Sequence, residues 1–139
     1  MIVVDTSIIA ALYFPSPDNQ IVENLRRFDD FWVAPHLWKS EFRNVAGLYH
    51  RKGFISFEEA AEAVEIAEDD MEGYGQSVDS HEVLNAIRES SCSSYHCEFI
   101  ALARTMFTFL VTFDKKILRE FPGIATTPED YIKINQIKE

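Results

Sequence analysis

Short apolar runs alternate with longer amphipathic segments along the chain. The short runs are rich in β-branched and aromatic residues, as buried strands are, and they cover residues 2–4, 31–34, 109–112 and 123–126. Segments with helical spacing separate or follow them, at residues 6–13, 18–28, 35–53, 56–72, 80–90, 95–106 and 115–121, with a last helix from Pro128. Strands that alternate with helices predict a parallel sheet covered by helices on both faces.

The chain offers no place to divide this pattern. It has no internal repeat, no low-complexity segment and no linker, and a chain of 139 residues normally closes around one core. We therefore expect a single α/β domain that spans residues 1–139. Within it, Ser56 and Glu59 have the spacing of a capping box at the start of the helix 56–72.

The net charge of −10 is concentrated in one predicted helix. Between residues 58 and 72 the chain has eight acids and no base (Glu58, Glu59, Glu62, Glu65, Glu68, Asp69, Asp70 and Glu72). The rest of the chain has 13 bases and 15 acids, a near balance that is compatible with phosphate binding. The acidic segment is either a solvated helix face or a surface for a basic partner protein.

Composition also indicates the compartment. Hydrophobic residues make up 47% of the chain, which suits a folded core. No apolar run approaches the roughly 20 residues that span a bilayer, and the first residues lack the features of a signal peptide. Cys92 and Cys97 are too few for a disulfide scaffold. We therefore expect a cytoplasmic protein without a membrane segment.

Two acids directly follow predicted strands. Asp5 comes after the run 2–4, and Asp114 lies just past the run 109–112. Ligands of open α/β folds bind at the carboxyl edge of the sheet, so both carboxylates are candidate metal ligands. Each acid also precedes a predicted helix, and each could instead be that helix's N-cap.

Glu41 stands on the apolar face of a predicted helix. On a helical projection it lies between Leu48 and Val45 and is the only charged residue in that arc. A buried carboxylate is costly unless it is paired or bound to a metal ion. Glu41 is therefore either a metal ligand or one half of a buried salt bridge with an arginine.

Four segments resemble the motifs of the PIN-domain family, and within it the VapC-like toxins, and they occur in the family's order. They are Val3-Val4-Asp5-Thr6-Ser7, then Ser40-Glu41, then Ser94 to Ala103 with Tyr95-His96 and Ala101-Leu102-Ala103, and last Leu110-Val111-Thr112-Phe113-Asp114. The matches span nearly the whole chain.

The resemblance implies a PIN-like three-layer α/β/α fold with a twisted, mainly parallel sheet of about four to five strands. It also implies a ribonuclease that hydrolyses single-stranded or structured RNA with Mg²⁺ or Mn²⁺. The metal ligands would be Asp5, Glu41 and Asp114, with Ser7 and Thr112 as polar support. Such toxins are commonly homodimers that an antitoxin protein of a type II toxin–antitoxin module holds inactive.

The third segment departs from the family pattern. His96 stands where the family has an acid, so the catalytic set of this chain would be Asp5, Glu41, Asp114 and His96. Helical spacing places His96 on an apolar face, so it is either a ligand or a core histidine. Glu98 lies about 200° further round the helix and could reach the site only if the first turn is irregular.

Two other functions stay open at this point. With His96 in place of an acid, the domain could have lost catalysis and only bind RNA or a protein partner. A phosphotransfer receiver domain also combines an α/β fold with strand-end acids, but it has an acidic pair where Asp5 stands alone.

Overall fold

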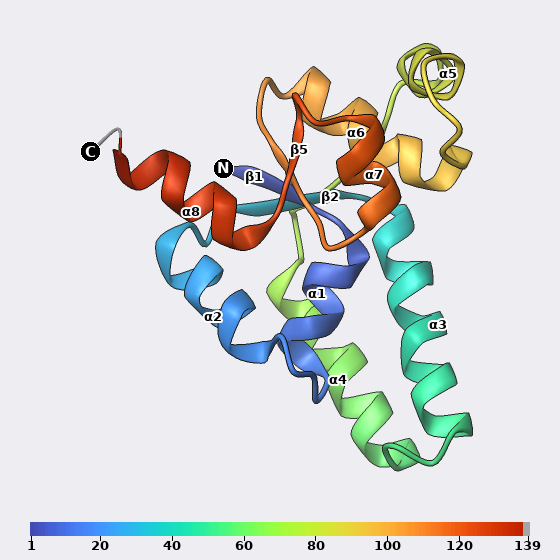
Figure 1. Cartoon of the computed structure of the whole chain (residues 1–139). Coiled ribbons are helices and arrows are strands. Elements are labelled where there is room, and N and C mark those ends of the chain that lie inside the picture. Colours follow the sequence, from blue (N-terminus) through green and yellow to red (C-terminus); the bar gives the residue numbers. More distant parts are fainter. Residues whose placement is uncertain (138–139) are drawn as a thin grey trace.

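Residues 1–137, which the structure describes, form five short strands and eight helices in a computed structural model of the chain (Figure 1). The last two residues of the predicted domain, 138 and 139, lie outside that range. The elements in chain order are β1 (Ile2–Val4), α1 (Thr6–Tyr13), α2 (Asn19–Phe28), β2 (Trp32–Pro35), α3 (Leu37–Arg51), α4 (Phe57–Asp70), β3 (Gly75–Gln76), α5 (Ser80–Arg88), α6 (Ser94–Thr105), β4 (Leu110–Val111), α7 (Lys115–Glu120), β5 (Ala125–Thr126) and α8 (Pro128–Ile137).

The strands form one parallel sheet in the order β3-β2-β1-β4-β5. β1 is central, and its three residues are fully buried, as the apolar run predicts for a strand covered on both faces. Val4 pairs with Val111 of β4. The residues that follow these two strands therefore lie side by side at the carboxyl edge of the sheet.

Helices cover both faces of the sheet (Figure 1). On one face α6 packs across β1, β2 and β4, and α5 packs on α6. On the other face α1 packs on β1, with α2, α3 and α4 gathered round it. This arrangement confirms the predicted three-layer α/β/α class. No helix among residues 1–137 combines the length and the apolar character needed to cross a membrane.

The boundaries of the helices and strands lie within two residues of most predicted ones, but the edge strand β3 was not predicted. The capping box is confirmed, because Ser56 accepts from the N–H of Glu59 while the Glu59 carboxylate accepts from the N–H of Ser56. Residues 75–76, for which no strand is predicted, pair with β2 as an edge strand. Two residues without a hydrophobic pattern give no strand signal. Pro35 belongs to β2, so α3 begins at Leu37 and not at the proline.

Candidate active site

A cavity of about 610 Å³ opens at the carboxyl edge of the sheet. Its wall comes from the starts of α1, α3 and α6 and from the turn between β4 and α7. Five of the residues singled out in the sequence line it, namely Asp5, Ser7, Glu41, His96 and Asp114. The fold thus brings together acids that are separated by up to 109 residues of sequence.

Asp5 is a buried carboxylate, and within residues 1–137 it has no basic partner. Its Oδ1 accepts from the backbone N–H of Ser7 at 2.8 Å, which caps α1, and from the Ser7 hydroxyl. Its Oδ2 accepts from the hydroxyl of Thr112. Burial raises the pKa of Asp5, and the hydrogen bonds from Ser7 and Thr112 oppose that rise. The residue is therefore a helix cap and also a cavity-lining acid.

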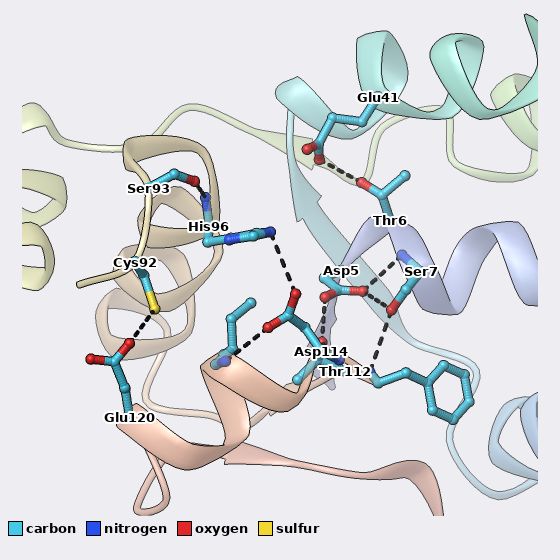
Figure 2. Close-up of polar contacts among 12 residues, drawn as sticks. Asp5, Thr6, Ser7, Glu41, Cys92, Ser93, His96, Thr112, Asp114 and Glu120 are labelled. Carbon is cyan, nitrogen blue, oxygen red and sulfur yellow. Dashed lines mark hydrogen bonds and ion pairs between the residues drawn. The ribbon is translucent and has the colours of Figure 1, made fainter. Parts of the chain in front are cut away.

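Thr112 connects the two strand-end acids (Figure 2). Its fully buried hydroxyl donates to Asp5 and accepts from the backbone N–H of Asp114 at 2.9 Å. Oδ1 of Asp114 accepts from the N–H of Ile117 at 2.9 Å and so caps α7. The N-cap interpretation is therefore correct for Asp114 too, and Oδ2 is the oxygen that stays outside the cap.

His96 lies at the cavity and not in the core. Its ring points toward Asp114, with Nε2 at 3.7 Å from Oδ2 (Figure 2). The side chain is 38% exposed, which excludes the core-histidine interpretation. The helical spacing is compatible with a core position, because spacing alone does not show how far a residue lies from the start of its helix. His96 is on the first turn of α6, and that turn borders the cavity. The backbone N–H of His96 donates to the hydroxyl of Ser93, the N-cap of the helix.

Glu41 lies on another wall of the cavity, where its Oε1 accepts from the hydroxyl of Thr6 at 2.7 Å (Figure 2). The predicted apolar arc was too wide, because Leu48 is 41% exposed. The buried face of α3 is narrower and consists of Trp38, Phe42 and Ala46. Glu41 is therefore half-buried at the border of that face. No arginine among residues 1–137 pairs with it, so the salt-bridge interpretation is wrong within that range.

Glu98 is not part of the cavity wall. α6 is helical from Ser94 onward, so the irregular first turn that would have brought Glu98 into the site is not present. The side chain is half-buried, and burial followed by the negative charge of Glu41 raises its pKa. Glu98 therefore sits close enough to Glu41 to repel it, without replacing the missing acid.

Two solved structures share the architecture over nearly the whole chain. PAE2754 from Pyrobaculum aerophilum matches with a TM-score of 0.75 at 19% identity, and the match covers 99% of this chain and 97% of that one. FitAcB from Neisseria gonorrhoeae matches with a TM-score of 0.70 at 14% identity, over 93% and 99% of the two chains. No protein-family model and no curated protein matches the sequence. The likeness shows the fold, which is PIN-like.

Three residues of the site were not predicted from the sequence. Thr6 holds Glu41, and Asn44 and Tyr95 line the cavity. Thr6 and Tyr95 stand within the quoted motifs, and Asn44 is one helical turn beyond Glu41, so helical spacing could have found it. An exposed tyrosine such as Tyr95 has no sequence signal of its own.

The donor set at the cavity fits a hard divalent cation in an open site. In the part of the chain that the structure describes, no three acidic, histidine or cysteine side chains lie close enough to hold one ion by themselves. Mg²⁺ commonly takes only one or two carboxylates and completes its octahedron with water and substrate phosphate. Thr112 bonds to the carboxylate of Asp5 and to the backbone N–H of Asp114, and both acids line the cavity, where they would offer such a pair of carboxylates. The residues fit a site that substrate completes, and not a closed cage.

Proposed function

We propose that this chain is a divalent-metal-dependent ribonuclease of the VapC-like toxin kind. The observation that carries the proposal is Asp5, a buried carboxylate that no base neutralises within residues 1–137 and that faces a cavity beside Asp114. Burial of a charged carboxylate is unfavourable, and a bound cation would offset that cost. The order of the four sequence motifs and the PIN-like fold support the same function.

Asp5, Glu41 and Asp114 would hold Mg²⁺ or Mn²⁺, since carboxylate oxygens suit both ions. When bound, such an ion polarises a phosphodiester and lowers the pKa of water for hydrolysis. The chain's own residues would hold these carboxylates in a fixed orientation before the metal ion and the RNA bind. Thr112 orients Asp5, and Thr6 orients Glu41, so neither acid has to reorganise when RNA arrives.

His96 gives the proposed site a different charge from the family pattern. An imidazole replaces a carboxylate next to Asp114, so the site has one fewer negative group. Nitrogen is a poor ligand for Mg²⁺ and an acceptable one for Mn²⁺. If His96 ligates the ion, the protein should therefore favour Mn²⁺.

The proposal includes the partners of such toxins: an RNA substrate, a homodimer and an antitoxin protein, in the cytoplasm. The acidic helix α4 gives this part little support. Glu68 pairs with Arg43 at 3.1 Å and Asp70 with Arg26 at 3.8 Å, so the chain itself neutralises some of its acids. Those internal pairs favour a solvated helix face over a surface reserved for a basic partner.

A second candidate function is binding of RNA or of a protein partner without catalysis. The observation that favours it is again His96, because a site with one carboxylate fewer attracts a cation less strongly. The resulting domain would keep the cavity and the fold but lose the reaction.

A cleavage and binding assay separates the two candidates. Labelled single-stranded RNA is incubated with the purified protein in Mg²⁺, in Mn²⁺ and in chelator, and binding is measured on the same RNA. Cleavage that requires a divalent ion, with the higher rate in Mn²⁺, supports the ribonuclease. RNA that binds but stays intact in every metal supports the binding-only function. RNA that is neither bound nor cut contradicts both RNA functions.

A further inference from the structure

Tyr95 exposes its ring at the edge of the candidate active site. It lies on the first turn of α6 next to His96, lines the cavity and is 60% exposed. Phe99, one turn further along α6, also lines the cavity but is buried. The helix therefore adds two aromatic rings to the wall, one buried and the other largely open to solvent.

The cavity wall has no permanent positive charge to attract the phosphates of RNA. Neither lysine nor arginine occurs among its residues, while Asp5, Glu41 and Asp114 contribute carboxylates. Lys39, Arg43 and Lys115 each adjoin a wall residue in the sequence, but they are exposed and lie outside the wall. Repulsion by the acids would weaken any hold on the RNA backbone beyond the one phosphate that a cation contacts.

The rest of the wall is largely apolar. Leu37 and Val45 come from α3, and Phe113 comes from the turn after β4. An apolar surface with an accessible ring suits the face of a nucleobase, which stacks on aromatic side chains whatever its sequence. A paired base inside a helix has no free face, so such a surface selects an unpaired one.

We propose that Tyr95 is a stacking platform that binds one unpaired base next to the phosphate to be cut. The inference rests on the proposed ribonuclease function and adds how the strand is held. Affinity comes mainly from base stacking on Tyr95, and phosphate contacts contribute little. Removing that one base should therefore weaken binding about 5- to 150-fold, the range that corresponds to stacking on aromatic residues.

The test compares an RNA of known cleavage site with the same RNA made abasic at each flanking position. For the parent, the KM should rise about 5- to 150-fold when the stacked base is absent, with kcat little changed. Tyr95→Ala should show the raised KM on intact RNA and no further loss on the abasic one. Tyr95→Trp should retain the discrimination, whereas Tyr95→Leu, which keeps apolar area without a ring, should lose it.

A readout without catalysis uses 2-aminopurine at the flanking position, in Ca²⁺ in place of the catalytic metal. Its fluorescence should be quenched on binding to the parent and to Tyr95→Trp, but not to Tyr95→Ala. The matched control is Phe107→Ala, which removes a 97% exposed ring outside the cavity wall and should behave as the parent.

Three results would overturn the inference. A parent that cuts abasic and intact RNA with equal KM has no stacking platform, although the ribonuclease proposal survives. A Tyr95→Ala protein that changes its oligomeric state but keeps the base discrimination assigns Tyr95 to a protein interface. A parent that neither binds nor cuts RNA removes the proposed function, and the platform with it.

Discussion

The hydroxyl of Thr112 donates a hydrogen bond to the buried carboxylate of Asp5, across 107 residues of sequence. The contact follows from the sheet, because Val4 pairs with Val111 and the next residue of each strand reaches the same edge. The same hydroxyl accepts from the N–H of Asp114. One threonine thereby fixes the positions of both strand-end acids.

Replacing Thr112 with valine should therefore damage stability and activity together. The substitution keeps the shape but removes the partner of the Asp114 N–H and of Oδ2 of Asp5, at a cost of about 1–3 kcal/mol in the free energy of unfolding. Denaturant unfolding and single-turnover cleavage measure the two effects. Thr112→Ser should restore both, since the hydroxyl returns.

Thr126→Val is the matched control for that substitution. Thr126 is a buried threonine on the neighbouring strand β5, but its hydroxyl makes only a long contact of 3.4 Å. Its replacement should change stability by about 0.5 kcal/mol and leave cleavage unaltered. If Thr112→Val behaves in the same way, Thr112 does not position the acids.

The buried acid Asp5 predicts how stability depends on pH in the metal-free protein. Its pKa is raised by burial above the ordinary value of 3.8, so the folded state binds that proton more tightly than the unfolded state does. The free energy of unfolding should then fall as pH rises from the ordinary value through the raised one. Asp5→Asn lacks this proton and should gain stability relative to the parent over that interval.

Unfolding of both proteins across acid and neutral pH in chelator isolates the contribution of Asp5. The difference between them should grow with pH and then level off. A difference that is constant with pH would mean that Asp5 ionises alike in the folded and unfolded states.

Glu41 and Glu98 provide a matched pair for metal binding. Each carries a carboxylate, and burial together with the charge of Glu41 raises the pKa of Glu98, but only Glu41 lines the cavity. Removing either charge should raise the metal-free melting temperature, because repulsion disappears. Only Glu41→Gln should abolish the further rise that Mn²⁺ or Mg²⁺ gives by binding the folded state.

Thermal unfolding of the parent, Glu41→Gln and Glu98→Gln with and without each ion measures both effects. A lower metal-free melting temperature for Glu41→Gln would show that Glu41 stabilises the fold. Equal loss of the metal effect in both variants would place the ion elsewhere.

His96 predicts which metal the protein prefers. With an imidazole next to Asp114, the parent should cleave RNA mainly in Mn²⁺. His96→Asp adds the acid of the family pattern and should raise cleavage in Mg²⁺. The comparison uses both proteins in each metal, at the same low salt concentration. A parent that is equally active in both metals, with no gain for the variant, would place His96 outside the site.

The sequence predicted which acids gather at one cavity better than it predicted their surroundings. Asp5 and Asp114 could be found because each ends a short apolar run, and strand ends of a parallel sheet share one edge. Glu41 was found by its position among apolar residues, yet its half-buried environment was not, because a helical projection cannot tell a core face from a cavity wall.

Other features depend on tertiary contacts that leave no local pattern. β3 has only Gly75 and Gln76, which become a strand because β2 offers them an edge. His96 follows the spacing of the buried face of α6, but its place on the first turn takes it to the cavity. The exposure of Tyr95 likewise follows from where α6 begins.

Cleavage by Asp5→Asn is the most direct test of a metal-dependent ribonuclease. The substitution removes the charge and keeps the shape, and asparagine can still cap α1. Parent and variant are compared on labelled single-stranded RNA in Mn²⁺, in Mg²⁺ and in chelator, with melting curves to show that both are folded. The parent should cut only with metal, and the folded variant should be slower by about 100-fold or more. A folded Asp5→Asn protein that cuts RNA at the parental rate would contradict the assignment of Asp5 as a metal ligand.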